Sequence, residues 1–228
     1  MANIHVSTHP CAKAKLSQLR SASTNAKETK NLIHEIATIV ACEALAQGLT
    51  VEQTGTEDHS PLGYTYATET LHPSNITLIP ILRSGLSMLE PLQSLLPSTP
   101  SPSVHHLGMY REKSTLQPVE YYNNLPYHSK SGASPTAAAA DLAIVCDPII
   151  ATGSTLCAAI ETLRDWGVKR IISISILASR TGLERAADAW PEGVELWVAG
   201  VDAETDEQGM IKPGLGDIGD RLFLTVGK

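Results

Sequence analysis

Apolar residues recur at two different spacings along this 228-residue chain, and the two spacings predict both helices and strands. Helical spacing over Asn25 to Gln47 predicts a long amphipathic helix, which Gly48 is expected to end. A shorter helix is expected near Ala12 to Arg20. Residues 49–74 are rich in turn formers and leave room for a short strand or hairpin around Tyr64 to Thr68. Residues 1–50 are therefore expected to form an N-terminal helical region.

Short apolar runs alternate with amphipathic segments from residue 76 onward. Runs of this length predict buried strands, and the segments between them predict helices. The expected strands are Ile76 to Leu82, Val104 to Tyr110, Leu142 to Cys146, Arg170 to Ala178 and Val194 to Val201, and the expected helices are Ser87 to Leu96, the segment after Thr155 up to Trp166, and Leu183 to Trp190. This alternation is typical of an α/β fold, with a mostly parallel twisted sheet flanked by helices.

The remaining segments fit a single domain that covers residues 1–228. Tyr121 to Asn123 matches the return arm of a β-hairpin. Residues 129–140 are low in complexity, which is typical of a surface insert. We find no internal repeat and no change of composition that would mark a domain boundary.

Composition and charge exclude several classes of protein. The formal net charge is −7, which argues against nucleic-acid binding or attachment to an anionic membrane surface, since such proteins are normally basic. Hydrophobic residues make up 43% of the chain, enough for a core without help from a metal or disulfides. No signal peptide opens the chain and no apolar run approaches ~20 residues, so a cytoplasmic protein is expected.

Cysteines and histidines indicate no metal centre. The eight histidines show no metal-binding spacing. The four cysteines include no C-x-x-C pair, and we expect buried, reduced thiols rather than disulfides at Cys11, Cys42, Cys146 and Cys157.

The segment from Leu142 to Trp166 carries the clearest candidate site. An apolar strand ends at Asp147, a loop of small and hydroxyl-bearing residues follows over residues 151–155, and an amphipathic helix comes next. The first N–H groups of a helix have no internal partner and the helix dipole is positive there, so this loop suits an anion. It contains no Walker A pattern and fits a single monoester phosphate, with Asp147 placed to meet sugar hydroxyls. An ordinary strand-to-helix turn with a Ser/Thr N-cap explains the same residues.

Two more clusters fall at strand ends or in loops beyond them, where open α/β sheets bind ligands. Arg83-Ser84-Gly85 follows the expected strand over residues 76–82, and its small residues would let backbone amides approach a diphosphate. The loop over residues 213–220 combines glycines with aspartates. Taken alone, an exposed arginine and a glycine-rich surface turn also account for these two clusters.

Four motifs spread over the chain occur in a characteristic order. Residues 80–86 read P-I-L-R-S-G-L, residues 108–112 G-M-Y-R-E, residues 147–155 D-P-I-I-A-T-G-S-T and residues 213–221 P-G-L-G-D-I-G-D-R. They resemble P-I-L-R-A-G-L, G-M-Y-R-x-E, D-P-M-L-A-T-G-G-S and P-G-L-G-D-A-G-D-R of the uracil phosphoribosyltransferase family. His9-Pro10 also matches the opening of that family. The resemblance implies the type I phosphoribosyltransferase fold, with a β-hairpin lid and N-terminal helices.

The resemblance implies transfer of the 5-phosphoribosyl group from phosphoribosyl pyrophosphate to uracil N1, which gives UMP and pyrophosphate in pyrimidine salvage. The donor would bind with Mg²⁺ held mainly by its own oxygens, without a protein metal site. Arg83 and Arg111 would stabilise the charge on the departing pyrophosphate, and a flexible hairpin over residues 111–122 would cover the donor. The residues implied for the donor are Arg83, Ser84, Gly85, Arg111, Asp147, Pro148, Ile149, Ile150, Ala151, Thr152, Gly153, Ser154, Thr155 and Asp217.

The resemblance also implies that main-chain groups read the uracil edge, and that an aspartate helps remove the N1 proton. Relatives form homodimers or larger homo-oligomers, and some are activated by GTP. The residues implied for uracil are Ile211, Gly216, Asp217 and Ile218, and the implied catalytic residues are Arg83, Arg111, Asp147 and Asp217.

Several positions depart from the pattern of the family, including Ser84, which stands where alanine is usual, and the charged Lys212 next to Pro213. Ser154 and Ile218 stand where glycine and alanine are usual, and Met210 stands where an aromatic residue is common. Two alternatives stay open: a phosphoribosyltransferase for a different base, and a catalytically weak relative that binds nucleotide or donor as a regulatory signal. A doubly wound module for an unrelated phosphate ligand is a third hypothesis, but it does not explain four motifs in order.

Overall fold

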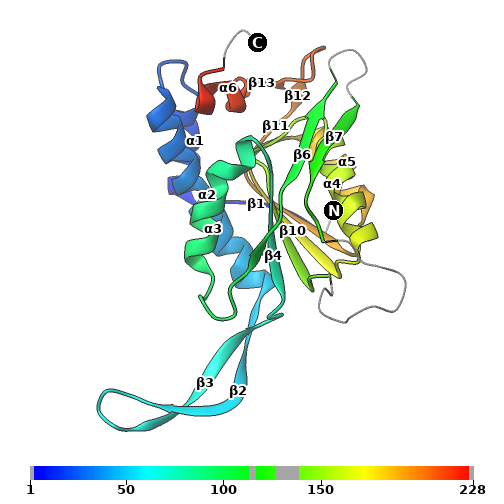
Figure 1. Cartoon of the computed structure of the whole chain (residues 1–228). Coiled ribbons are helices and arrows are strands. Elements are labelled where there is room, and N and C mark those ends of the chain that lie inside the picture. Colours follow the sequence, from blue (N-terminus) through cyan, green and yellow to red (C-terminus); the bar gives the residue numbers. More distant parts are fainter. Residues whose placement is uncertain (1–2, 113–116, 127–138, 226–228) are drawn as a thin grey trace.

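A computed structural model describes residues 3–112, 117–126 and 139–225 of the chain (Figure 1). Its elements, in chain order, are β1 (Ile4–Val6), α1 (Pro10–Leu19), α2 (Ala26–Gly48), β2 (Thr50–His59), β3 (Thr65–His72), β4 (Ile76–Leu82), the 3₁₀ helix η1 (Ser84–Met88), α3 (Leu89–Leu95), β5 (Ser103–Val104), β6 (Leu107–Arg111), β7 (Pro118–Asn123), β8 (Leu142–Cys146), β9 (Ile149–Ile150), α4 (Ser154–Trp166), β10 (Arg170–Ser179), α5 (Arg180–Ala189), β11 (Val194–Asp202), β12 (Glu204–Thr205), β13 (Ile211–Lys212) and α6 (Ile218–Phe223).

A mostly parallel sheet forms the centre of the molecule, as the sequence predicts. Its strand order is β1-β11-β10-β8-β4-β6-β7, with β5 beside β4 and β9 beside β10. Every pairing in this sheet is parallel except that of β6 with β7. All residues of β8 are buried, and β4 and β10 are buried along nearly their whole length. Burial on both faces explains why these strands are apolar throughout.

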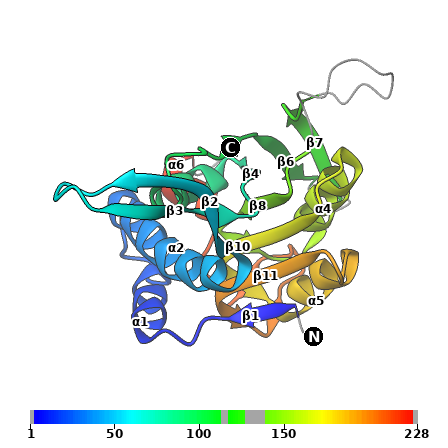
Figure 2. The ribbon, with the colours of Figure 1, turned by 90° about the horizontal axis from the view of Figure 1, so that it is seen from below.

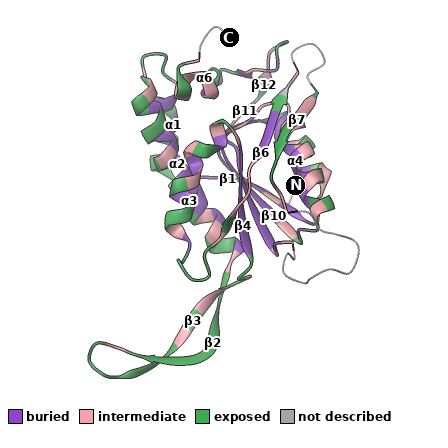
Figure 3. Cartoon of the chain, in the orientation of Figure 1, coloured by how far each residue is buried: buried purple, intermediate pink, exposed green. Residues whose placement is uncertain are grey.

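Helices cover the two faces of the sheet and create two hydrophobic layers (Figure 2). On one face, α1, α2 and α3 contribute to a cluster that includes Ile36, Ile144 and Ile174. On the other face, α4 and α5 contribute to a cluster that includes Ile160 and Val145. The buried strands lie between these layers, whereas the β2–β3 ribbon is exposed (Figure 3). This arrangement confirms the predicted fold class.

The sheet register brings the carboxyl ends of neighbouring strands together. Pro80 of β4 pairs with Cys146 of β8, and Cys146 in turn pairs with Ile174 of β10. The loops that follow β4 and β8 therefore leave the sheet at the same edge. Two of the three candidate clusters in the sequence follow these two strands.

The structure corrects the expected strand over Val104 to Tyr110, which is two strands, β5 and β6. Between them, the His105 N–H still donates to the Leu78 carbonyl at 3.0 Å, but the His106 N–H donates to the Asn124 side-chain oxygen at 2.6 Å. Because a side chain satisfies that N–H, the main-chain ladder is interrupted and then resumes at Leu107.

The N-terminal part contains more strand than the sequence predicts. The region expected to be helical begins with β1, which pairs with β11 at the edge of the sheet. The short hairpin expected near Tyr64 is a ribbon with strands of 10 and 8 residues. Gly48 is the last residue of α2, as expected, and a Cβ there would displace the end of the Ile172 side chain, which lies 2.3 Å from that position.

The first residues of two helices and the burial of the cysteines also differ from the prediction. The helix expected from Ser87 begins earlier as η1 and continues as α3, and α5 begins at Arg180 rather than Leu183. All four cysteines are free, as expected, but only Cys146 is buried. Within the described ranges, every helix is too short or too polar to cross a lipid bilayer.

Candidate active site

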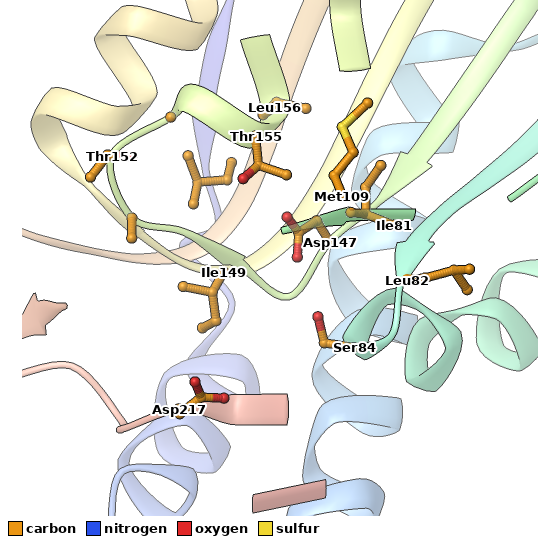
Figure 4. Close-up of a pocket in the computed structure, with 13 residues that line it drawn as sticks. Ile81, Leu82, Ser84, Met109, Asp147, Ile149, Thr152, Thr155, Leu156 and Asp217 are labelled. Carbon is orange, nitrogen blue, oxygen red and sulfur yellow. The ribbon is translucent and has the colours of Figure 1, made fainter. Parts of the chain in front are cut away.

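A cavity of about 260 Å³ opens at the edge of the sheet where β4 and β8 end (Figure 4). We call it the donor cavity, and it is enclosed by residues of β4, η1, β6, the β8–α4 loop and the start of α6. Its lining residues are Ile81, Leu82, Ser84, Met109, Asp147, Ile149, Ile150, Ala151, Thr152, Gly153, Thr155, Leu156 and Asp217. The cavity therefore joins all three clusters that the sequence singled out.

The loop over residues 151–155 leads directly into the N-terminus of α4 and forms one wall of the donor cavity. Gly153 caps this helix with φ +78°, and a Cβ there would lie 2.5 Å from the Gly182 carbonyl oxygen. Both the positive φ and the close approach require glycine. The loop can therefore present unpaired backbone N–H groups of the first helical turn to an anion.

Residues of α5 brace this loop from behind. The Ser179 hydroxyl, at the N-cap of α5, donates to the Ala151 carbonyl at 2.5 Å and accepts from the Gly182 N–H at 2.9 Å. Ser179 is fully buried. The position of the loop over residues 151–155 is thus fixed by the junction of β10 and α5, whose residues do not line the cavity.

Ser154 faces this bracing layer rather than the cavity. Its hydroxyl accepts from the Arg185 guanidinium at 3.1 Å and lies 2.9 Å from the Thr152 hydroxyl. Arg185 also donates to the Thr152 carbonyl, at 3.5 Å. The serine at this position does not crowd the loop, because its side chain is accommodated between two partners.

Asp147 is a buried carboxylic acid at the end of β8, with 8% of its surface exposed. Burial raises its pKa to about 7, although hydrogen bonds from the Ile149 N–H and the Ser84 hydroxyl act in the opposite direction. In Figure 4 the Ser84 and Asp147 side chains point toward each other across the donor cavity. This carboxyl can accept hydrogen bonds from a bound sugar once it is ionised.

The Arg83–Gly85 turn packs tightly against the end of β8. A Cβ at Gly85 would lie 2.3 Å from the Cys146 carbonyl oxygen, so the chain can approach this closely only with glycine. The Leu82–Arg83 peptide bond is cis. The Arg83 side chain is exposed, and its guanidinium carbon lies 5.5 Å from the centre of the Phe223 ring. Among residues 82–85, Leu82 and Ser84 line the donor cavity and Arg83 and Gly85 do not.

A second cavity of about 150 Å³ adjoins the first, and we call it the base cavity. It shares Ile149, Ala151 and Asp217 with the donor cavity. Its lining is mostly apolar and consists of Ile149, Ala151, Leu177, Gly209, Met210, Ile211, Leu215, Gly216, Asp217 and Ile218. All four residues that the sequence assigned to uracil line this cavity.

Two arginines hold the loop that forms the base cavity. Arg20 donates to both carboxylate oxygens of Asp202 at 2.7 Å and to the Gly214 carbonyl at 2.7 Å, while Asp202 accepts from the Gly214 N–H at 3.0 Å. Arg221 donates to the carbonyls of Leu19 and Leu215 at 2.6 and 2.7 Å. These bonds attach the base loop to α1 and β11.

Asp217 lies at the junction of the two cavities. It is the N-cap of α6, and its carboxylate accepts from the Asp220 N–H at 3.0 Å. Its neighbour Gly216 has φ +78°, which favours glycine. A carboxylate at this junction can reach groups bound in either cavity.

Arg111 ends β6, the strand that contributes Met109 to the donor cavity. It belongs to the β6–β7 hairpin, so the expected hairpin exists, and it extends from Leu107 to Asn123. The tip of that hairpin and residues 129–138 of the expected insert lie outside the described residues.

The described lining of the donor cavity carries two carboxyl groups, Asp147 and Asp217, and no lysine or arginine. In the described part of the chain, no group of three or more His, Cys, Asp or Glu side chains is arranged to hold a metal ion. An anionic ligand would therefore need cations from the cavity rim or from an ion that it carries.

The structure brings together most of the residues that the sequence assigned to the donor. Ser84, Asp147, Thr152, Thr155 and Asp217 line one cavity, whereas the side chains of Pro148 and Ser154 are not part of its lining. Sequence reasoning missed the residues that brace the loop. Ser179 had a detectable signal, as a serine directly after an apolar strand and before a helix. Arg185 had none, because its role arises only where α5 packs against the loop.

Comparisons with known proteins identify the family of the chain. A family model described as uracil phosphoribosyltransferase matches residues 6–225. Uracil phosphoribosyltransferases of Listeria welshimeri and Finegoldia magna are each 38% identical over 225 residues, which cover 99% of this chain and 100% of theirs. The solved structure of the AQ2163 protein from Aquifex aeolicus matches with a TM-score of 0.84 and 31% identity, covering 97% of this chain and 98% of that one. The chain belongs to the uracil phosphoribosyltransferase family.

Proposed function

We propose that the protein transfers the 5-phosphoribosyl group of phosphoribosyl pyrophosphate to N1 of uracil. The bond between ribose C1 and the pyrophosphate oxygen breaks, a bond between C1 and N1 forms, and the N1 proton is released. The products are UMP and pyrophosphate. Membership of the family and the geometry of the two cavities both support this reaction.

The observation that carries the proposal is the shared wall of the two cavities. Ile149, Ala151 and Asp217 line both, so a sugar in the donor cavity would lie next to a ring in the base cavity. Holding two reactants side by side removes much of the entropic cost of their reaction. A site of this kind needs no protein nucleophile.

Each part of the donor has a matching part of the cavity. The 5-phosphate would bind the backbone N–H groups at the start of α4, and Asp147 would accept from the ribose hydroxyls. Arg83 and Arg111 would stabilise the charge that grows on the leaving pyrophosphate. Arg83 would reach the pyrophosphate by leaving the ring of Phe223, and Arg111 would approach it from the β6–β7 hairpin.

Mg²⁺ fits this site as an ion carried by the donor. Magnesium usually keeps several waters and binds substrate phosphates together with one or two carboxylates. Asp147 and Asp217 are the carboxylates that the donor cavity offers. When bound, the ion neutralises part of the pyrophosphate charge.

The base cavity suits a small planar ring read by main-chain groups. Backbone N–H and C=O groups of residues 211–217 can match the donor and acceptor groups on the edge of uracil. A ring with a different edge would leave buried polar groups unpaired, which is a large penalty. Asp217 would help remove the N1 proton. Ile218 and Met210 line this cavity and would set the size of the ring that it accepts.

The β2–β3 ribbon supports assembly into a homodimer or larger homo-oligomer. All residues of β2 and most residues of β3 are exposed, and four large apolar or aromatic side chains on the ribbon, Val51, Leu62, Tyr64 and Tyr66, are 50–83% exposed. A projecting ribbon that buries such side chains on a second copy would remove them from water. We therefore assign the ribbon to the contact between copies.

An assay with a panel of bases tests the proposed reaction. Purified protein, Mg²⁺ and phosphoribosyl pyrophosphate are mixed with uracil, cytosine, hypoxanthine or orotate, and the release of pyrophosphate is followed. We expect turnover with uracil alone. Turnover with another base would assign a different phosphoribosyltransferase activity, and donor binding without turnover of any base would assign a regulatory role.

A further inference from the structure

We infer that Arg185 is a positioning residue for the donor 5-phosphate and that it acts through Ser154 and Thr152. The inference rests on the proposed function. It assigns a role to a side chain on α5 that does not line the donor cavity. It also explains how this chain uses a serine at a position where a glycine is usual in the family.

The three side chains form a continuous hydrogen-bonded row that ends at the cavity. The Arg185 guanidinium lies 3.1 Å from the Ser154 hydroxyl, which lies 2.9 Å from the Thr152 hydroxyl. Ser154 is buried, with 7% of its surface exposed, whereas Thr152 lines the donor cavity. The row therefore runs from an exposed cation, through a buried hydroxyl, to the wall of the cavity.

The direction of these hydrogen bonds follows from the chemistry of arginine. A guanidinium can only donate, so the Ser154 oxygen must accept from it. The Ser154 hydrogen then needs an acceptor, because an unpaired buried hydroxyl is costly, and the Thr152 oxygen is the one within reach. Thr152 thus accepts from Ser154, and its own hydrogen is left to donate to a further acceptor.

The result is a hydroxyl that is fixed as a donor at the wall where the phosphate would bind. A threonine hydroxyl that turns freely offers either a lone pair or a hydrogen, and only the hydrogen suits an anion. Hydrogen bonds in a chain polarise one another, so the charge of Arg185 strengthens the last donor. Such help is useful here, because the described lining of this cavity contains carboxyl groups and no cation.

Ligands that occupy different parts of the donor cavity test this role. The dissociation constants of ribose 5-phosphate and of inorganic pyrophosphate are measured by calorimetry with Mg²⁺ for the wild type and for Arg185→Met, Ser154→Ala and the double variant. We expect each single variant to bind ribose 5-phosphate about ten-fold more weakly. The double variant should be no weaker than the single ones, since both interrupt the same row. Pyrophosphate affinity should stay within two-fold of the wild type.

Two further variants separate positioning from general damage. Arg185→Lys keeps a donating cation and should restore part of the ribose 5-phosphate affinity. Arg164→Met removes an exposed arginine from the last turn of α4, at the other end of that helix, and should change nothing. In steady-state kinetics, Arg185→Met should raise the KM for phosphoribosyl pyrophosphate and leave the KM for uracil unchanged.

Three results would overturn the inference. They are unchanged binding of ribose 5-phosphate by Arg185→Met, an equal loss of affinity for both ligands, and additive losses in the double variant. If the wild type turns over uracil while one of these results is found, only the role of Arg185 fails. If the wild type binds ribose 5-phosphate through the row but turns over no base, only the proposed function fails. A wild type that does not bind ribose 5-phosphate contradicts both.

Discussion

Asp147 is a buried carboxylic acid in the wall of the donor cavity. It occupies a position where burial opposes its charge, since its pKa is raised to about 7. A carboxyl group in this state destabilises the empty protein near neutral pH. Active sites commonly retain such groups because the ligand needs them.

The Asp147→Asn variant should separate the effect of this carboxyl group on stability from its effect on donor binding. The pKa of Asp147 is near 4 in the unfolded chain and about 7 in the folded protein. Between pH 4 and pH 7, Asp147 therefore keeps its proton in the folded protein and loses it in the unfolded chain. The free energy of unfolding of the wild type therefore falls as the pH rises through this window. Asparagine can still accept from Ile149 and Ser84 but does not ionise. The variant should gain stability over the wild type, by at most about 4 kcal/mol, between pH 4 and pH 8.

Thermal unfolding of both proteins at pH 4, 6 and 8 measures this difference. The same variant should bind phosphoribosyl pyrophosphate more weakly at pH 8, where the wild-type carboxylate is ionised. If the difference in stability between the variant and the wild type does not change with pH, folding does not raise the pKa of Asp147.

Some residues of the site could be predicted from the sequence and others could not. The motif around Asp147 was recognisable because it is a contiguous stretch, and the structure places most of it in one cavity. The orientation of Ser154 was not predictable, since it depends on Arg185, which lies 31 residues further along the chain. Arg83 was predicted to face the pyrophosphate, and this remains a prediction, because its guanidinium lies over Phe223 in the structure.

Among the elements, the loop that closes the base cavity depends most on distant support. It contains little regular structure of its own, and hydrogen bonds to Asp202 of β11 and to Arg20 after α1 fix its path. The Arg20–Asp202 pair is largely buried, with 25% and 8% of the two side chains exposed. Such a pair is rigid, so it can hold the loop in one position.

Asp202→Asn should therefore disturb uracil binding without changing donor binding. The amide keeps the bond from the Gly214 N–H but weakens the paired bond from Arg20, and hydrogen bonds to charged groups contribute about 1.5–3 kcal/mol. We expect the KM for uracil to rise by about ten-fold or more and the KM for phosphoribosyl pyrophosphate to stay within two-fold. Steady-state kinetics below the unfolding temperature measures both values.

Glu35→Gln provides the matched control. It weakens the exposed ion pair between Lys15 of α1 and Glu35 of α2. Exposed pairs of this kind contribute little, so both KM values should match the wild type. An equal rise of both KM values in Asp202→Asn would mean that the pair supports the whole fold rather than the base loop.

Elements with a strong periodic pattern were predicted, and those defined by pairing were not. The apolar runs of β4, β8, β10 and β11 and the amphipathic faces of α2 and α4 were all recognisable. In contrast, β1 has only three residues and forms because β11 offers an open edge. The division between β5 and β6 depends on the Asn124 side chain, which no local pattern reveals.

At the scale of the whole molecule, the β2–β3 ribbon projects from the body (Figure 1). Two-stranded ribbons are marginally stable alone, and this one is exposed in both strands. Contact with a second copy would stabilise it. A short strand or hairpin was predicted here around Tyr64 to Thr68, but the full length of the two strands was not.

A shortened ribbon should change the assembly and leave the body folded. Residues 54–68 are replaced by Asn-Gly, which joins the paired residues Gln53 and Glu69 in a two-residue turn. We expect the sedimentation mass to fall to that of one chain, with the far-ultraviolet circular dichroism of the body retained. The double variant Val51→Ser, Tyr66→Ser should weaken assembly less. An unchanged mass for the shortened protein would exclude the ribbon as the contact between copies.

The central claim is that the two adjoining cavities form one site for the two halves of a nucleotide. A crystal structure of the protein with UMP tests it most directly, because UMP carries both the 5-phosphate and the base. We predict that the phosphate contacts backbone N–H groups of residues 152–155 and that the uracil ring lies beside Ile218, with its edge against the main chain of residues 211–217. A phosphate outside the α4 loop, or a base outside the base cavity, would contradict the account.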